Sequence, residues 1–294
     1  MNPLEKLLET GNPILLDGAM GTMLIDAGLE PGDSPETWNI DHPERIAAVH
    51  REYIQAGSQV ILTNSFGGTR PRLAMHSIGD RGLELNRAAA QIARAEADVV
   101  PHTVVVAGSM GPTGQLLAPM GTLTIDDAKK VFAEQAQGLL EGGVDIFWIE
   151  TMSDLNEVKA AVAGIRSVSD LPISATMSFD THGHTMMGVN PAKAVEALSP
   201  LDILAIGANC GTGSDELEEA VKSMRDAYPD AILVAKANAG IPQMTADGDV
   251  IYNGSPEVMA QYALNIREIG AKLIGGCCGS GPAHIHAMAE ALRK

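Results

Sequence analysis

Three cysteines are the residues of this 294-residue chain whose types and spacing suggest chemistry. Cys210 lies in GANCGTG, and Cys277 and Cys278 are adjacent in GGCCGSGP. Adjacent cysteines do not form an ordinary disulfide with each other, and an odd total does not make a disulfide framework. Three thiolates brought together can take three corners of a tetrahedron around Zn²⁺ and leave the fourth for a water or a substrate atom. Because such a site binds a thiol as its thiolate at neutral pH, the pattern favours thiol alkylation.

Two other interpretations of these residues stay open. Free cysteines are commonly buried and inert, so Cys210 could be a core residue and the adjacent pair a coincidence of composition. Gly275 and Gly276 could form a phosphate-binding nest, which barrels often build around strands seven and eight. The protein would then be a phosphate-binding lyase or isomerase with structural cysteines, and it would hold no stoichiometric zinc. A non-catalytic zinc scaffold is disfavoured, because an open three-thiolate site is a poor structural device.

The cysteines must be positioned by the elements around them, which alternate along the chain. Short apolar runs rich in Val and Ile end in Gly, Asp, Asn or Glu, and stretches with helical spacing separate them. The predicted strands are 14–17, 60–64, 104–108, 146–150, 173–178, 203–207, 232–237 and 272–276. The predicted helices are 42–56, 82–98, 124–141, 154–168, 191–198, 214–227 and 255–269, with a last helix beginning near His284.

Eight apolar strands alternating with helices predict a single (β/α)8 TIM barrel over residues 1–294, with the active site at the C-terminal ends of the strands. A doubly wound open sheet is the competing fold. The first strand leads into LLDGAMGTML and not into a GxGxxG turn, which argues against a dinucleotide site. Long loops over 109–122 and 238–256 follow predicted strands, where barrels carry their chemistry. Strands six and eight flank strand seven, so all three cysteines are expected at one rim.

The charge composition limits which kinds of molecule the protein is expected to bind. The chain has 20 Lys and Arg against 37 Asp and Glu, a net charge of −17, so nucleic acid and anionic membrane surfaces are not expected partners. No stretch approaches the roughly 20 apolar residues that cross a bilayer, and no leader pattern is visible. These features predict a cytoplasmic protein, and we expect a homo-oligomer.

Five segments resemble, in order, the motifs of the zinc-dependent homocysteine S-methyltransferases. This family includes bacterial betaine-homocysteine methyltransferases and the homocysteine domain of cobalamin-dependent methionine synthase. The resemblance runs over about 15–292, and the pairing of GANC with GGCCG is its most specific part. The five segments are LLDGAMGTML (15–24), ILTNSFGG (61–68), IFWIETMSD (146–154), GANCGTG (207–213) and IGGCCGSGPAHI (274–285).

The resemblance implies roles for individual residues. It implies that Cys210, Cys277 and Cys278 ligate Zn²⁺ and that the homocysteine sulfur takes the fourth position. Asp17 and Glu150 match the acidic positions that hold the homocysteine amino group, which suits an ammonium. In the same comparison, the backbone amides of Gly18 and Ala19 approach the substrate carboxylate, and Asn64 lines the pocket or orients a neighbour. For Asp17 and Glu150, helix capping or a rim ion pair is the structural alternative.

The methyl donor is a separate question. A quaternary ammonium such as betaine needs aromatic faces, and the chain has 2 Trp, 4 Tyr and 4 Phe. Trp38 and Tyr252 are predicted to contact the donor, whereas Trp148 is expected in the core. Gly67 and Thr151 stand where animal-type betaine enzymes carry tyrosines, so an animal-type cage is not expected.

The sequence therefore predicts an S-methyltransferase that uses Zn²⁺ to transfer a methyl group from a small onium donor to homocysteine, giving methionine. Betaine is the favoured donor. The alternatives are a sulfonium donor, such as S-methylmethionine or dimethylsulfoniopropionate, and a corrinoid protein or methylcobalamin as the source of the methyl group.

Overall fold

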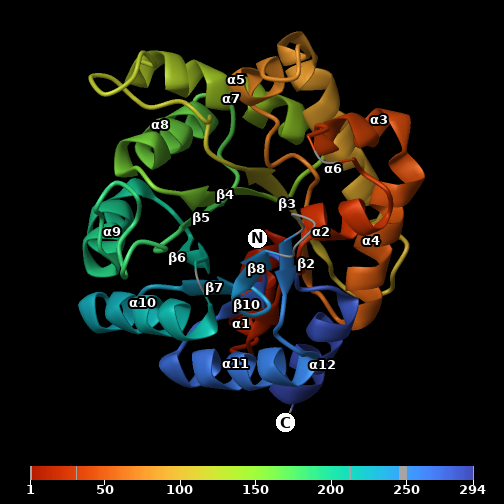
Figure 1. Ribbon diagram of the computed structural model, residues 1–294, viewed down its shortest axis with the longest axis vertical. Helices are drawn as coiled ribbons and strands as arrows, with labels where there is room; N and C mark the ends of the chain where they lie inside the picture. Colours follow the sequence, from red (N-terminus) through yellow and green to blue (C-terminus); the bar gives the residue numbers. More distant parts are fainter. Residues whose placement is uncertain (1, 31, 212, 245–249, 294) are drawn as a thin grey trace.

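The computed structural model describes residues 2–30, 32–211, 213–244 and 250–293. Within them, eight parallel strands form one sheet in the order β1-β10-β7-β6-β5-β4-β3-β2. A parallel bridge between Leu16 and Val60 joins the first and last strands of that order, so the sheet closes into a barrel with helices around it (Figure 1). The barrel strands are β1 (Ile14–Leu15), β2 (Val60–Leu62), β3 (Val105–Met110), β4 (Ile146–Met152), β5 (Ile173–Met177), β6 (Ala205–Cys210), β7 (Leu233–Ala237) and β10 (Leu273–Gly276). The predicted (β/α)8 fold is confirmed.

Helices cover the outside of the barrel, and their ends follow local chemistry. The side chains of Thr124, Asp154, Asn190 and Ser255 each accept a hydrogen bond from the first turn of a helix, as N-caps do. Several helices end at a glycine with left-handed backbone angles, as the helix Pro43–Ala56 does at Gly57. The covering helices are α4 (Pro43–Ala56), α6 (Gly82–Asp98), α7 (Ile125–Gly142), α8 (Leu155–Arg166), α9 (Pro191–Leu198), α10 (Ser214–Ala227), α11 (Pro256–Ile269) and α12 (Pro282–Leu292).

Alternate strand residues face two different cores. Phe147 and Ile149 belong to the outer cluster, which packs against the helices, whereas Trp148 belongs to the cluster inside the barrel. The inner cluster also contains Leu4 of α1 (Pro3–Glu9), with Leu7 and Leu8 packed against it. The helix α1 therefore closes one end of the barrel. Trp148 is a core residue, as expected.

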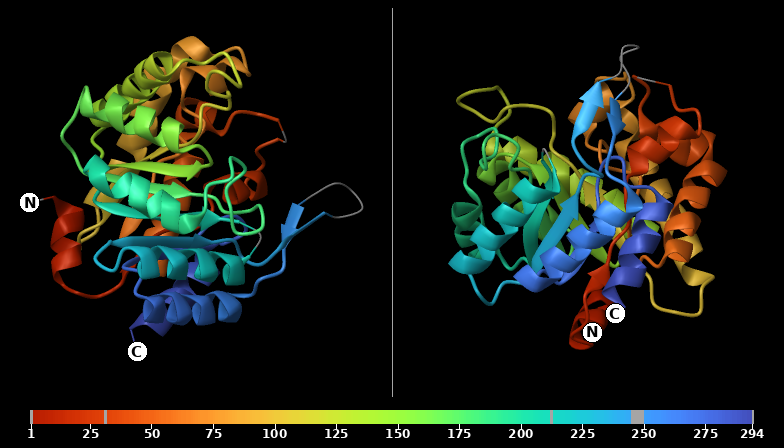
Figure 2. Two further views of the ribbon diagram at one scale, coloured as in Figure 1. Left: turned by 90° about the vertical axis from the view of Figure 1, so that its left-hand side faces the viewer. Right: turned by 60° about the horizontal axis from the view of Figure 1, so that its bottom comes forward.

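Two parts of the chain differ from the sequence-based expectation. The helix α1 was not predicted, because it is only seven residues long and its apolar face is recognisable only where it packs against the barrel. The loop predicted over 238–256 contains an antiparallel hairpin of β8 (Pro242–Met244) and β9 (Val250–Tyr252), while 245–249 lie outside the described residues. Figure 2 shows this hairpin projecting from the end of the barrel opposite to α1.

Further short helices lie in the connections. They are α2 (Met20–Asp26), α3 (Trp38–Asp41), α5 (Arg70–Ala74) and the 3-10 helices Pro35–Thr37, Gly79–Arg81 and Ser199–Leu201. Three of them, α2, Pro35–Thr37 and α3, extend the connection between β1 and β2 over the carboxyl end of the strands, so this connection is placed to form a wall of the site. No helix in the described ranges is long and apolar enough to cross a membrane.

Candidate active site

The three cysteines meet at the carboxyl end of the barrel. Cys210 is the last residue of β6, and Cys277 and Cys278 directly follow β10, with β7 between the two strands. Their sulfur atoms all lie within 4.8 Å of one another, and the Sγ atoms of Cys210 and Cys277 are 2.7 Å apart. The sequence-based expectation that all three share one rim agrees with this geometry.

Two asparagines hold the cysteine segments in place. The Asn209 side chain accepts from the Thr151 amide and donates to Thr151 Oγ1, and its Nδ2 lies 3.4 Å from the sulfur of Cys210. Asn238 donates to the Gly211 carbonyl and accepts from the Cys278 amide, so it ties the loop after β6 to the loop after β10. Hydrogen bonds of Asn209 and Asn238 thus link the cysteine-bearing segments to each other and to β4.

The electrostatics of the cluster suit a cation. The hydrogen bonds that the Cys210 thiol donates to the neighbouring sulfur atoms, together with burial, raise the pKa of Cys210, whereas the hydrogen bonds that Cys278 receives lower its pKa. Three thiolates at this spacing repel one another unless a positive charge lies among them. Soft sulfur ligands in threes are a donor set that Zn²⁺ accepts. The residues present therefore fit a zinc ion.

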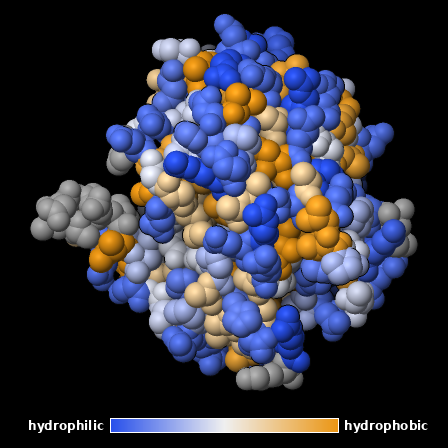
Figure 3. All heavy atoms as spheres, turned by 90° about the vertical axis from the view of Figure 1, so that its right-hand side faces the viewer, coloured by the Kyte–Doolittle hydropathy of each residue, from blue (hydrophilic) through white to orange (hydrophobic). Residues whose placement is uncertain are grey.

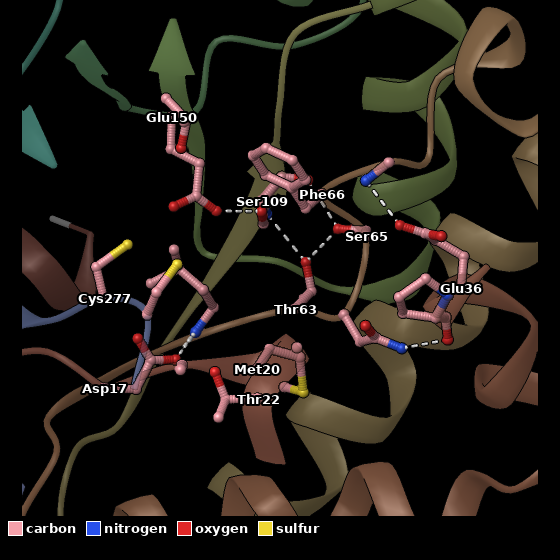
Figure 4. A pocket seen from close by; sticks show the side chains of 18 of the residues that line it. Asp17, Met20, Thr22, Glu36, Thr63, Ser65, Phe66, Ser109, Glu150 and Cys277 are labelled. Atoms are coloured by element: carbon pink, nitrogen blue, oxygen red, sulfur yellow. Dashed lines mark hydrogen bonds between the residues drawn. The ribbon is translucent and has the colours of Figure 1, made fainter. Parts of the chain in front are cut away.

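A cavity of about 410 Å³ opens beside the cysteines. Its walls come from the ends of β1, β2, β3, β4, β6, β7 and β10, and from the connection between β1 and β2. Figure 4 shows Cys277, Glu150 and Asp17 on one side of it and Glu36 on the other, with Phe66 and Ser109 between them. A cavity this size has room for more than one small molecule.

The two predicted acidic residues line the cavity and are buried, but their partners differ. Asp17 accepts from the Leu62 amide at 2.6 Å and pairs with Lys236 Nζ at 2.9 Å. Glu150 accepts a hydrogen bond from the Ser109 hydroxyl, and it has no ion-pair partner in the part of the chain that the structure describes. Burial raises the pKa of Glu150 to about 7, against the opposing effect of Lys236. Burial also raises the pKa of Asp17, while Lys236 lowers it.

The backbone amides of Gly18 and Ala19, at the start of α2, differ in whether they are free to bind a substrate carboxylate. Gly18 lines the cavity, and a Cβ there would lie 2.1 Å from the Ser280 carbonyl oxygen, so only glycine fits. The N–H of Ala19 already donates to that carbonyl at 2.9 Å. It is therefore not free to bind a substrate carboxylate in this structure, whereas the N–H of Gly18 has no partner among the described residues.

Asn64 also lines the cavity, and its side chain holds neighbouring segments. It donates to the Pro35 carbonyl and to Asn39 Oδ1, which fixes the connection between β1 and β2 against β2. Asn64 thus has the pocket position and the orienting contacts that the sequence left as alternatives.

The two predicted donor-binding aromatics lie elsewhere. Trp38 is buried under Arg45, whose guanidinium lies 4.8 Å from the ring centroid, and it is not among the residues that line the cavity. Tyr252 is hydrogen-bonded to Cys278 and covers Gly279, so it belongs to the surroundings of the cysteine cluster. Phe66, by contrast, lines the cavity, and its ring approaches the backbone at Gly111.

Gly67 and Thr151, the positions where animal-type betaine enzymes carry tyrosines, are each in contact with a neighbouring side chain. A Cβ at Gly67 would lie 2.8 Å from Glu36 Oε1, which accepts a hydrogen bond from the Gly67 amide. Thr151 has a positive φ of 61° and is held by Asn209. A larger side chain at 67 would require the Glu36 carboxylate to move. That the chain has no animal-type cage stays a prediction.

Lys236 is the site residue that sequence reasoning missed. It interrupts the apolar run LVAKA of β7, and two residues earlier Val234 belongs to the cluster inside the barrel. Since side chains two apart on a strand share a face, the lysine also points inward. A charged residue in a buried strand is the signal that could have found it.

The architecture of the site and the family of the chain agree. A barrel whose three cysteines meet at the carboxyl rim, above two buried carboxylates, has the architecture of a barrel enzyme with a sulfur-rich metal site. The model of the homocysteine S-methyltransferase family matches residues 14–292, and the chain belongs to this family. The expected membership and the S-methyltransferase class are thereby confirmed.

Relatives with known names agree with the family. Methionine synthase of Mycobacterium leprae is 34% identical over 295 residues, which cover 95% of this chain and 24% of the relative. Methionine synthase of Mycobacterium tuberculosis is 34% identical over 293 residues, which cover 94% of this chain and 24% of the relative. The chain thus spans about a quarter of the length of these curated relatives. The crystal structure of the Escherichia coli homocysteine methyltransferase MmuM in its metallated form superposes with a TM-score of 0.83 at 25% identity, covering 98% of this chain and 99% of that one.

Proposed function

We propose that this protein transfers a methyl group from a small onium donor to the thiolate of homocysteine, giving methionine and the demethylated donor. The observation that carries the proposal is the convergence of Cys210, Cys277 and Cys278 on a cavity that Glu150 and Asp17 also line. The side of the cavity with the cysteines suits a thiol, and the side with the carboxylates suits an ammonium. Homocysteine carries both groups.

Zinc is the metal proposed for the cysteines. A zinc ion held by the three sulfur atoms supplies a positive charge that lowers the pKa of an incoming thiol, and so provides the nucleophile at neutral pH. That the E. coli relative has been solved in a metallated form supports a metal in this chain as well. No general base is needed once the thiol proton has been lost.

The chain's own residues position the reactants and exclude water. The thiolate sulfur forms a bond to the methyl carbon while the bond from that carbon to the donor nitrogen or sulfur breaks, and the electron pair leaves with the neutral donor. Alignment of the two molecules in one cavity lowers the entropic part of the barrier. Because a cationic donor loses its charge in this step, a cavity that desolvates the cation favours the transition state.

Betaine is the donor we favour. Phe66 offers an aromatic face on the cavity wall, which Glu36 also lines. Among the described residues, the hydrogen-bond partners of the Glu36 carboxylate are the neutral groups of Ser34 and Gly67. An aromatic face and an uncompensated negative charge both attract an onium cation. The roles first assigned to Trp38 and Tyr252 in binding the donor stay predictions, and their positions favour indirect contributions.

A corrinoid protein is the alternative source of the methyl group. The relatives named methionine synthase are about four times as long as the segment that matches this chain. A partner that carries the corrinoid would then dock over the open cavity. A homo-oligomer and a cytoplasmic location complete the proposal as further predictions.

The experiment is methionine formation, followed by mass spectrometry, with zinc-loaded and reduced protein, homocysteine and a panel of donors. The panel holds betaine, dimethylsulfoniopropionate, S-methylmethionine and methylcobalamin. We expect methionine with betaine, and loss of both zinc and product in Cys278→Ala. Met186→Ala, on an exposed side chain, serves as control. Activity with methylcobalamin alone would favour the corrinoid alternative, and full turnover in a metal-free cysteine variant would contradict the proposal.

A further inference from the structure

Lys236 is a buried cation on the wall of the cavity. Its side chain is 3% exposed, and its Nζ lies 2.9 Å from Oδ1 of Asp17, whose side chain is also 3% exposed. In the register of the barrel, Lys236 lies beside Asn209 of β6 and Gly275 of β10, one residue before the level of Cys210. The ammonium is therefore held just below the sulfur atoms and faces the same cavity as they do.

The pairing of Lys236 changes what Asp17 offers to a ligand. One oxygen of Asp17 accepts from Lys236 and the other accepts from the Leu62 amide, so each already has a partner in the chain. Among the described residues, the hydrogen bond that Glu150 accepts comes from the Ser109 hydroxyl. Of the two carboxylates, Glu150 is the one whose charge is left for the ammonium of a bound amino acid.

The carboxylate of an amino acid then needs a donor at this end of the cavity. The Ala19 amide is occupied by Ser280, and the Gly18 amide offers a single neutral N–H. Arg72, a second cation on the cavity wall, packs against Gly114 in the loop after β3. Lys236 carries three N–H donors, of which Asp17 takes one. Two remain for a ligand in a place where water is largely excluded and a charge-assisted hydrogen bond is strong.

We infer that Lys236 binds the carboxylate of the thiol acceptor, with Asp17 fixing its ammonium in position and Glu150 binding the amino group. The inference rests on the proposed function and refines it, because it assigns opposite ends of a zwitterion to opposite charges in the chain. It makes the acceptor class a thiol that carries both an amino group and a carboxylate. It also changes Asp17 from a residue that contacts substrate to a positioning residue.

The test measures binding, so it does not depend on turnover. Isothermal titration calorimetry of the zinc-loaded, reduced protein gives Kd for homocysteine, for 3-mercaptopropylamine, which lacks the carboxylate, and for 4-mercaptobutyrate, which lacks the amino group. In the wild type, we expect homocysteine to bind about 10- to 100-fold more tightly than 3-mercaptopropylamine, as a charge-assisted hydrogen bond predicts. In Lys236→Met, this advantage should fall below about threefold, while the Kd of 3-mercaptopropylamine changes little.

Two further variants keep the test decisive. Lys236→Met leaves Asp17 buried without its cation, so Asp17→Asn combined with Lys236→Met removes both charges and should show the same loss of discrimination. Lys222→Met, an exposed lysine paired with Asp226 on α10, is the matched control and should bind like the wild type. Zinc content is measured for every variant.

The outcomes separate the two proposals. If homocysteine and 3-mercaptopropylamine bind the wild type equally, or if Lys236→Met weakens both alike, Lys236 has only a structural role and the inference is overturned. If none of the three thiols binds the zinc-loaded wild type, it is the proposed function that fails.

Discussion

Glu150 is the cavity residue whose ionisation depends most visibly on its surroundings. It is buried beside Ser109, and burial raises its pKa from 4.5 to about 7. A carboxyl group that is harder to ionise in the folded protein than in the unfolded chain binds more protons when folded. Near neutral pH, the same group would change charge just where an ammonium needs it ionised.

The first prediction concerns the pH dependence of stability. Below about pH 4.5, Glu150 is protonated in the folded and the unfolded state and does not change the free energy of unfolding. As pH rises from 4.5 to 7, ionisation of the buried carboxyl group lowers the free energy of unfolding, and the loss is complete above pH 7. Glu150→Gln removes that cost, so in metal-free protein the variant should be more stable than the wild type at pH 8 by up to about 3 kcal/mol, and equal to it at pH 4. Urea unfolding at the two pH values measures this, with Glu268→Gln, exposed on α11, as control. A gain at pH 4 equal to that at pH 8 would refute it.

Single residues also show where sequence reasoning stops. The cysteines were found because their type is rare and each follows a recognisable strand. Lys236 was missed because nothing near it in the sequence carries its partner, Asp17, which lies 219 residues away. Likewise, the burial of Trp38 and the occupied amide of Ala19 depend on Arg45 and Ser280, which tertiary packing brings to them.

At the scale of elements, the two-residue period of the strands explains the position of the site. Inward-facing Trp148 and Val234 belong to the apolar layer inside the barrel, and Glu150 and Lys236 stand two residues further along the same strands. The site is thus the next layer above an apolar one. That layer rests in turn on α1, which supplies Leu4 from the other end.

Leu4 provides the prediction at this scale. It is fully buried in the cluster inside the barrel, so Leu4→Ala leaves a cavity at the end opposite the cysteines. We expect the free energy of unfolding to fall by about 2–4 kcal/mol with no change in zinc stoichiometry. Chemical denaturation and metal analysis measure the two quantities. Leu83→Ala, at a partly exposed position of α6, should cost under about 1 kcal/mol; an equal loss in both variants would mean that α1 does not close the barrel.

The strands and covering helices could be predicted because apolar runs and helical periods are local signals. The helix α1 and the hairpin of β8 and β9 could not, since each is short and Leu4 finds its apolar partners only in the assembled barrel. Both lie at the ends of the barrel, where the alternation of strands and helices no longer applies.

The whole molecule carries much more negative than positive charge, with 37 acidic against 20 basic residues. The face in Figure 3 is mainly hydrophilic, with hydrophobic residues in scattered groups. Most of the ion pairs in the described residues are exposed, as those of Arg70 and Lys222 are, and each such pair contributes little to stability. Repulsion among the excess acidic groups is therefore the larger electrostatic effect on the folded state.

This balance predicts how salt changes stability. Raising NaCl from 0.02 to about 0.5 M shortens the Debye length to a few ångströms, which screens the repulsion of a chain with net charge −17. At pH 7.5 the midpoint of thermal unfolding should rise by about 3–6 °C, because the compact state gains more from screening than its exposed ion pairs lose. Near pH 5, close to the isoelectric point of about 4.7, the net charge is small and the same salt should change the midpoint by less than about 1 °C. Differential scanning fluorimetry of the metal-loaded protein at both pH values makes the comparison. If salt lowers the midpoint at pH 7.5, the ion pairs outweigh the repulsion and the acidic surface stabilises the fold through local pairing.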